Sequence, residues 1–285
     1  MAIRPKTLSA AAAPVAIGTA LAFRDGLLAP GPAFAALVGA LLIQVATNLA
    51  NDYFDFVKGT DTGDRVGPTR VTQAGLLSPQ AVKRGMWITL AAALAVGVYL
   101  VSVGGWPIVI IGLVSLMLAI GYTAGPVPLA YVGLGDLFVF VFFGLVAVGG
   151  TYWVQGHSLP PEVLWAGVGP GALATAILVV NNLRDRPGDE ATGKRTLAVR
   201  FGDGFSRAEY LFLLFLAWHV PPLGVAVFGW PWLTLLALLT FIAAIPSIRL
   251  VWSDGERVAL NPALGGTARV LAFYAGLLAL GLALG

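Results

Sequence analysis

Long apolar segments alternate with short polar ones along the whole chain. Nine segments are apolar enough to predict helices, at residues 7–23, 33–51, 85–104, 107–122, 134–154, 163–183, 208–228, 231–249 and 267–284. A transmembrane helix needs roughly 20 mostly apolar residues, so the pattern predicts an all-α integral membrane protein with nine transmembrane helices. The most polar stretch, residues 55–85, is too short to fold alone. We therefore expect a single transmembrane domain over residues 1–285.

The composition fits this interpretation and excludes several kinds of site. The chain is 58% hydrophobic and 11% charged, with a mean hydropathy of +0.86, whereas soluble domains carry about 25% charged residues. It has no cysteine, which excludes disulfides, thiolate nucleophiles and cysteine-ligated zinc. The net charge of +3 indicates the bias that orients membrane helices rather than nucleic-acid binding. We expect no nucleic-acid partner, and no obligate protein partner is evident.

The connections between the apolar segments differ in length and charge. Those near 24–32, 105–106, 155–162 and 229–230 are short, whereas those at 52–84, 123–133, 184–207 and 250–266 are longer. If the N-terminus and the longer connections share one side, 16 of the 17 Lys and Arg residues lie there, and Arg24 is the exception. The positive-inside rule then places the N-terminus in the cytoplasm and the C-terminus outside a plasma or inner membrane. Because the later helices need this start, we expect the first apolar segment to be a span and not a cleaved signal peptide.

Two clusters of acidic and amide residues follow the second and the sixth apolar segments. The first is Asn48, Asp52 and Asp55, and the second is Asn181, Asp185, Asp189 and Glu190. The spacing i, i+4, i+7 places the first three on one face of a helix, if the helix continues that far. In the second cluster, Pro187 disfavours helical conformation for the residue before it. We therefore expect the helix that carries Asp185 to end before Asp189, which would then lie on a loop folded back over the site. Ionisable residues at the depth of a membrane are functional candidates by default.

The two clusters have the chemistry of a site for a metal and a phosphorylated ligand. Carboxylate and carboxamide oxygens suit Mg²⁺, which takes one or two carboxylates together with phosphate oxygens of a substrate. Basic residues accompany both clusters: Lys58, Arg65 and Arg70 follow the first, and Arg184, Arg186, Lys194 and Arg195 surround the second. Metal and cations together favour departure of diphosphate, so that the C–O bond of an allylic ester can ionise. Participation of Asp61, Asp64, Glu190, Arg4 and Lys6 stays open.

The chain resembles the UbiA superfamily of intramembrane prenyltransferases over essentially its whole length. The motifs that carry the resemblance are RPKTL (4–8), NDYFDFVKGTDT (51–62), DRVGPTRVTQAG (64–75), GYTAGPVPLAYVGLGD (121–136) and NNLRDRPGDEATGKRTLAVRFG (181–202). The fourth motif and the GKRTLAVRFG end of the fifth are similar to the branch that prenylates 1,4-dihydroxy-2-naphthoate. The resemblance implies nine helices around a central cavity, and the charge partition puts the active site toward the cytoplasm.

The resemblance also implies residue roles and a reaction. The implied catalytic and Mg²⁺-binding residues are Asp52, Asp55, Asp185 and Asp189, with Asn48 and Asn181 supporting the metal. Lys58, Arg70 and Lys194 would bind diphosphate, and Tyr122 would contact the acceptor. The implied reaction transfers a polyprenyl group from polyprenyl diphosphate to 1,4-dihydroxy-2-naphthoate, with loss of CO₂ and diphosphate. The product that the resemblance implies is a demethylmenaquinol of menaquinone biosynthesis.

Two other functions fit part of the pattern. One is a UbiA-type prenyltransferase that acts on another aromatic acceptor. The other is an ion-coupled membrane transporter, but its carboxylates are expected near the midplane, in broken helices. The acidic residues here cluster at one face of the membrane, which favours the prenyltransferase.

Overall fold

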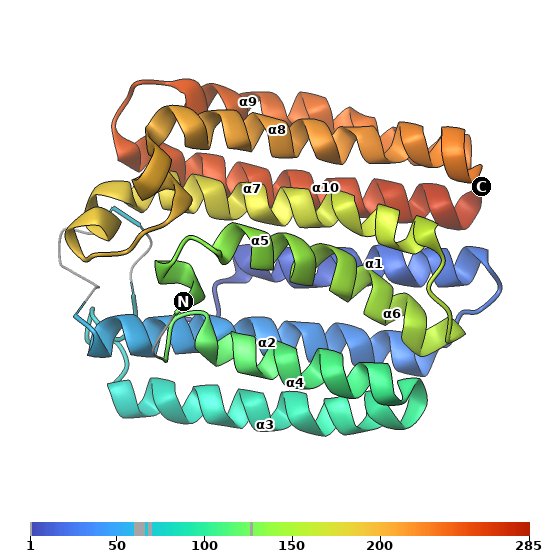
Figure 1. Ribbon diagram of the computed structural model, residues 1–285, viewed down its shortest axis with the longest axis horizontal. Coiled ribbons are helices and arrows are strands. Elements are labelled where there is room, and N and C mark those ends of the chain that lie inside the picture. The colour runs from blue at the N-terminus through green and yellow to red at the C-terminus, as the bar shows by residue number, and fades with distance from the viewer. Residues whose placement is uncertain (1, 60–65, 68–69, 126–127) are drawn as a thin grey trace.

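The chain folds into a bundle of long helices that run side by side (Figure 1). The structure is a computed structural model that describes residues 2–59, 66–67, 70–125 and 128–285, and the regular structure in these ranges is helical. Its first helices are α1 (Pro5–Arg24), α2 (Pro30–Val57), α3 (Pro79–Gly104) and α4 (Trp106–Gly121). One continuous helix follows, made of α5 (Gly135–Phe140), a π-helical segment (Val141–Val146) and α6 (Ala147–Gly156). The rest are α7 (Pro161–Ala191), α8 (Leu197–Phe228), α9 (Thr240–Trp252) and α10 (Leu260–Leu284). The 3₁₀ segments are Leu129–Tyr131, Trp232–Leu239 and Arg257–Ala259.

Eight helices in the described part of the chain are long and apolar enough to cross a membrane. They coincide with eight of the nine apolar segments that the sequence predicts. The remaining segment forms α4, which has 16 residues and spans about 24 Å at 1.5 Å per residue. The all-helical membrane architecture expected from the sequence is therefore confirmed, with eight helices of full membrane length.

Local sequence signals explain where the helices begin, and two helices end later than the sequence predicts. Proline occupies a first-turn position of α1, α2, α3, α4 and α7, where its missing N–H costs no helical hydrogen bond. The Ser78 hydroxyl caps α3 by accepting from the Ala81 N–H at 3.2 Å. The helix α2 runs to Val57 and α7 runs to Ala191, so both acidic clusters lie on helical turns.

The bundle has two separate packed cores. The larger core joins α1, α6, α7, α8 and α10 around buried side chains such as Tyr152, Tyr210 and Tyr274. The smaller core joins α2, α3 and α4 around Leu49, Met86 and Ala119. Figure 1 shows α2, α3 and α4 on one side of the bundle and α7 to α10 on the other, with α1, α5 and α6 between them. A cavity lined by residues of both halves lies between the two cores.

The π-helical segment brings the middle of the bundle close to α7 and contributes to the cavity wall. A Cβ atom on Gly144 would lie 2.5 Å from the Gly167 carbonyl oxygen, so only glycine permits this approach. Phe142 and Phe143 of the same segment line the cavity. The local change to π-helical hydrogen bonding thus occurs beside the cavity. Segments of this kind are frequent at functional sites.

A small polar network lies at the end of the bundle opposite the acidic clusters. Arg24 lies 2.8 Å from Asp25 and 2.9 Å from Glu162. The Tyr152 hydroxyl donates to Asp25 at 2.6 Å, and the Trp230 indole N–H donates to Glu162 at 2.8 Å. Arg24 is the single basic residue that the charge partition leaves on this side, and here it is paired with two carboxylates. Its exception to the charge bias therefore has a local structural explanation.

Candidate active site

The cavity between the two cores has a volume of about 660 Å³. Its walls are mostly aliphatic and aromatic side chains of α1 to α7, among them Ile43, Leu116, Phe138 and Ile177. At the end where α2 and α7 terminate, the lining is polar and includes Asn48, Asn51, Asp55, Arg70, Asn181, Asn182, Asp185, Asp189 and Lys194. Residues of both acidic clusters, which are far apart in sequence, thus line one cavity.

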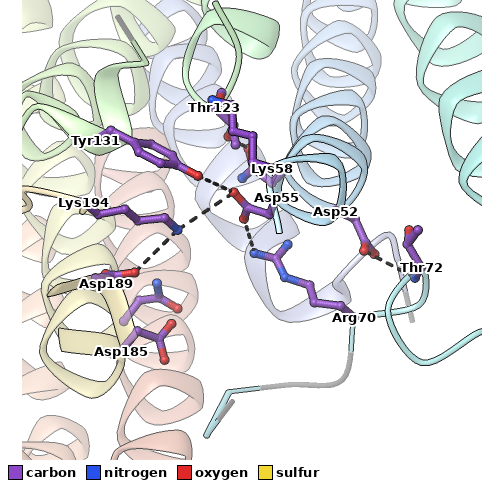
Figure 2. A network of polar contacts seen from close by, with 12 residues as sticks. Asp52, Asp55, Lys58, Arg70, Thr72, Thr123, Tyr131, Asp185, Asp189 and Lys194 are labelled. Atoms are coloured by element: carbon purple, nitrogen blue, oxygen red, sulfur yellow. Dashed lines mark hydrogen bonds and ion pairs between the residues drawn. The ribbon is translucent and has the colours of Figure 1, made fainter. Parts of the chain in front are cut away.

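Asp55 is the centre of the polar contacts at this end of the cavity (Figure 2). One of its carboxylate oxygens lies 2.8 Å from the Arg70 guanidinium, and the other accepts from the Tyr131 hydroxyl at 3.2 Å. Asp55 is only 4% exposed. A buried carboxylate requires such partners, because its charge loses the solvation that water would give.

Lys194 connects the two acidic clusters. Its ammonium nitrogen lies 3.9 Å from Asp55 and 3.5 Å from Asp189, so one cation bridges the end of α2 and the end of α7. The same nitrogen lies 4.9 Å from the centre of the Tyr131 ring. A cation at this distance from an aromatic face is stabilised by the ring quadrupole.

Lys58 reaches the site from the residue after α2. Its ammonium donates to the Thr123 carbonyl at 2.6 Å and lies 4.6 Å from the Tyr131 ring centre. Partial desolvation lowers the pKa of Lys58 below its usual value; the Asp55 carboxylate opposes this shift, and the Lys194 ammonium adds to it. Two lysines and one carboxylate therefore meet at Tyr131.

Arg184 holds the residues at the start of the second cluster. Its guanidinium, 1% exposed, makes two contacts of 2.8 and 2.7 Å with Asp185. It also donates to the side-chain oxygens of Asn181 at 2.8 Å and Asn261 at 3.0 Å. Arg184 is thus a buried structural partner that orients Asp185 and Asn181, a role that the sequence did not distinguish from diphosphate binding.

Asp52 and Asn48 also have partners outside the cavity. Asp52, 1% exposed, accepts from the backbone N–H groups of Val71 at 3.2 Å and Thr72 at 3.4 Å, and it is not among the cavity-lining residues. Asn48 lines the cavity and donates to the Ile3 carbonyl and the Thr7 hydroxyl. The metal-binding role of both residues stays a prediction, and the contacts give Asp52 a second role as a cap for the segment after Arg70.

The prediction that α7 ends before Asp189 is wrong. The helix continues through Pro187 to Ala191 and carries Asp185 and Asp189 on one unbroken element. The sequence argument failed because it considered only the local preference of the residue before proline. The carbonyl of Leu183, which a non-proline residue 187 would have engaged, accepts a hydrogen bond from Arg257 instead.

The remaining sequence candidates have different locations. Tyr122 lines the cavity, and its hydroxyl lies close to Gly135, where a Cβ atom would be 2.9 Å away. Arg4 also lines the cavity, whereas Glu190 is exposed and does not. Asp61, Asp64 and the side chain of Lys6 lie outside the described residues. The sequence did not identify Tyr131 as a site residue, because nothing in its local sequence distinguishes a tyrosine that contacts several charged groups from an ordinary loop residue.

The described residues suit a divalent ion that arrives with phosphate oxygens. Within the described ranges, no three acidic or histidine side chains converge on one point. Asp55 and Asp189 both lie within 4 Å of the same ammonium group, however, and Asp185 lines the same cavity. Mg²⁺ typically takes one or two protein carboxylates and fills its other positions with water and phosphate. The donor set therefore fits a metal–diphosphate complex better than a metal held by protein alone.

Comparisons with known proteins show similarity in both sequence and fold. The model of the UbiA prenyltransferase family matches residues 11–262. The chain is 39% identical over 280 residues to the 1,4-dihydroxy-2-naphthoate octaprenyltransferase of Escherichia coli, covering 94% of this chain and 89% of that protein. The fold is similar to the apo structure of a UbiA homolog from Aeropyrum pernix, with a TM-score of 0.72, 15% identity and coverage of 94% and 96%. It is also similar to a UbiA homolog from Archaeoglobus fulgidus bound to DMAPP and Mg²⁺, with a TM-score of 0.64, 16% identity and coverage of 97% of each chain.

We predict that Lys194→Met makes the folded protein more dependent on divalent cations. The substitution removes the ammonium group between Asp55 and Asp189, and the two carboxylates then repel each other. We expect a loss of roughly 1–3 kcal/mol of stability without metal. Mg²⁺ should raise the melting temperature of the variant more than that of the wild type, because the ion takes the place of the ammonium.

The measurement is a thermal-shift series of the purified protein in detergent across Mg²⁺ concentrations. Lys83→Met is the matched control, since the Lys83 ammonium also lies over a tyrosine ring, at 5.6 Å from the centre of Tyr53, but does not line the cavity. Equal Mg²⁺ responses of wild type and Lys194→Met would contradict the proposed exchange of ammonium for metal.

Proposed function

The chain belongs to the UbiA prenyltransferase family, and on this premise we propose that it transfers a polyprenyl group to 1,4-dihydroxy-2-naphthoate. The donor is a polyprenyl diphosphate, and the reaction releases diphosphate and CO₂ to give a demethylmenaquinol for menaquinone biosynthesis. The observation that carries the proposal is the apolar cavity whose polar end holds Asp55 and Asp189 bridged by Lys194. The relative from Escherichia coli, which carries the name of this activity, supports the choice of acceptor.

In this proposal the charged groups pair with one another in the free protein and bind the metal and the diphosphate in the complex. Without ligand, Arg70 and Lys194 neutralise Asp55 and Asp189. When the diphosphate enters, Arg70, Lys194 and the nearby Lys58 turn to its oxygens, as arginine and lysine readily do. The carboxylates released from these pairs are then available to Mg²⁺, so little charge is left without a partner at any stage.

The residues that we propose as metal ligands come from the two helices α2 and α7. Asp55, Asp185 and Asp189 are oriented by the contacts described above, and Asp52 with Asn48 and Asn181 completes the proposed set. Bound Mg²⁺ would supply Lewis-acid neutralisation of the diphosphate oxygens. The UbiA homolog structure that contains DMAPP and Mg²⁺ supports the use of this metal.

The apolar walls of the cavity support the rest of the reaction. Cleavage of the C–O bond transfers its electron pair to the diphosphate and leaves an allylic cation on the prenyl chain. Aromatic faces stabilise such a cation, and Phe138, Phe142 and Tyr122 line the chamber. The ring carbon that bears the acceptor carboxylate then forms the new C–C bond, and that carboxylate departs as CO₂. We place the acceptor beside Tyr122, between the prenyl cation and the segment that contains Gly135.

We also propose the arrangement in the membrane. The chain would form a single transmembrane domain with nine spans around the cavity, the N-terminus and the active site facing the cytoplasm, and the C-terminus outside the plasma membrane. In this arrangement the shorter α4 crosses as the fourth span. The partition of 16 of 17 basic residues to one side supports the orientation.

The test of the function is a reaction of the purified protein with Mg²⁺, farnesyl or geranylgeranyl diphosphate, and carboxyl-labelled 1,4-dihydroxy-2-naphthoate. We expect labelled CO₂ and a prenylated quinol of the matching mass, both abolished by chelation of the metal. Diphosphate release without consumption of the naphthoate would reject this acceptor and retain prenyl transfer. No turnover across a range of chain lengths would reject the proposed function.

In the same assay we predict that Asp55→Asn and Asp185→Asn each lower kcat by about 10³-fold, since each removes an anionic ligand and keeps the side-chain volume. The melting temperature should fall, because Arg70 or Arg184 loses a charged partner, so activity is measured well below it, where gel filtration should still show folded protein. Asp254→Asn is the matched control, because that side chain is 93% exposed and pairs with Arg207 outside the cavity.

Asp52→Asn separates the two roles of Asp52. If Asp52 binds the metal, as proposed, turnover should fall as far as in Asp55→Asn, with the melting temperature nearly unchanged. A lower melting temperature with kcat retained would show instead that Asp52 serves only as the acceptor for the Val71 and Thr72 N–H groups.

For the membrane arrangement we predict opposite labelling of two single-cysteine variants. The chain has no native cysteine, so Gln80→Cys and Ser158→Cys, both at exposed positions, can be read without background. An impermeant maleimide added to intact cells should label Ser158→Cys, after five spans, and should not label Gln80→Cys, after two. Protection of both would mean that α4 does not cross the membrane, and the reverse pattern would contradict the orientation.

A further inference from the structure

Pro187 leaves a gap in the hydrogen bonding of α7 beside the active site. In an α-helix the N–H of residue 187 would donate to the carbonyl of Leu183, and proline has no N–H to donate. Leu183 is 2% exposed, so bulk water does not replace the missing donor. A buried carbonyl without a partner is costly, and this gap falls within the helical turns that carry Asp185 and Asp189.

Arg257 closes this gap from a distant part of the chain. It is the first residue of the 3₁₀ segment between α9 and α10, and its guanidinium Nη1 donates to the Leu183 carbonyl. Its other terminal nitrogen, Nη2, lies 2.8 Å from the Asp203 carboxylate on α8. Asp203 also accepts from Arg186, the residue before Pro187, at 2.7 Å. One arginine thus ties the end of α7 to α8 and to the connection that precedes α10.

The segment that Arg257 stabilises carries more than the two carboxylates. The backbone N–H of Lys194 donates to the Asp189 carbonyl at 2.8 Å, so the position of Asp189 also sets the start of the Lys194 side chain. Lys194 in turn bridges Asp189 and Asp55. A bend of α7 at Pro187 would therefore displace the carboxylate and the ammonium together.

We propose that Arg257 is a positioning residue of the active site. By donating to the carbonyl that Pro187 leaves open, it keeps the last turns of α7 helical and holds Asp189 and Lys194 opposite Asp55. Arg257 is not among the residues that line the cavity, so its effect is transmitted through α7. The kinetic part of this inference rests on the proposed prenyl transfer, whereas its structural part does not.

The test uses the chemistry of the gap itself. In Pro187→Ala the backbone N–H of residue 187 returns and can donate to Leu183, so Arg257 becomes dispensable for this bond. We expect Arg257→Ala to raise the KM for polyprenyl diphosphate about tenfold, the effect of losing one charge-assisted hydrogen bond. Pro187→Ala should resemble the wild type, and Pro187→Ala combined with Arg257→Ala should recover most of the lost affinity.

Two further variants separate this role from general stabilisation. Arg207→Ala is the matched control, because Arg207 likewise pairs with a carboxylate, Asp254, and donates to a carbonyl, that of Ser253, both at 3.0 Å. These partners follow α9 and are not on α7, and Arg207 does not line the cavity. We expect its KM to be unchanged. Asp203→Asn keeps the Arg257 donor to Leu183 and weakens the ion pairs of Asp203 with Arg257 and Arg186, so it should raise the KM less than Arg257→Ala does.

Hydrogen exchange gives a readout that does not depend on activity. Amides of peptides that cover residues 184–192 should exchange faster in Arg257→Ala, return toward the wild-type rate in the double variant, and stay unchanged in Arg207→Ala. If the wild type transfers no prenyl group, the proposed function fails and the exchange data still decide the role of Arg257. If the wild type is active and adding Pro187→Ala to Arg257→Ala restores neither the KM nor the protection of amides 184–192 from exchange, the positioning role is rejected.

Discussion

The structure depends on the placement of carboxylates at the edge of an apolar cavity, where each needs a positive or hydrogen-bonding partner. Burial of an unpaired charge in such surroundings costs several kcal/mol, and here the partners come from both helices and from the connections between them. Asp55 has Arg70 and Tyr131, Asp185 has Arg184, and Lys194 serves Asp189 and Asp55 together. These contacts place the end of α2 opposite the end of α7, and they fix the polar end of the cavity.

The two halves of the bundle explain how a cavity of this size persists. Each half has its own core, one around α7, α8 and α10 and the other around α2, α3 and α4. Since neither core has to extend across the middle to be stable, the space between them can stay open for an apolar chain. The pairs at Asp55 connect the two halves at one end, whereas the polar network at Arg24 joins α1, α6 and α7 within the larger core at the other. A ligand with a charged head and an apolar tail matches this distribution of polarity.

The tyrosine at position 131 and the arginine at position 257 illustrate how the site is held by residues that do not belong to the acidic clusters. Tyr131 lies near the ammonium groups of Lys58 and Lys194 and donates to Asp55, so one ring orders three charged groups. Arg257 supplies a donor to α7 at the place where proline removed one. Both residues lie on short 3₁₀ segments between long helices, whose positions are set by packing rather than by their own sequence.

The sequence by itself determined the membrane class, the approximate helices and the residues of the two clusters, because helical hydrogen bonds and apolar periodicity act over a few neighbouring residues. It also placed Asp55, Asp185, Asp189 and Lys194 among the candidates, and the structure brings all four to one cavity. Only the tertiary structure decided that α7 continues through Pro187 and that Asp52 is turned toward Val71 and Thr72. Those outcomes depend on contacts such as Arg257 with Leu183, between residues far apart in sequence. No local pattern encodes which distant donor will reach a given carbonyl or carboxylate, so these details followed from packing alone.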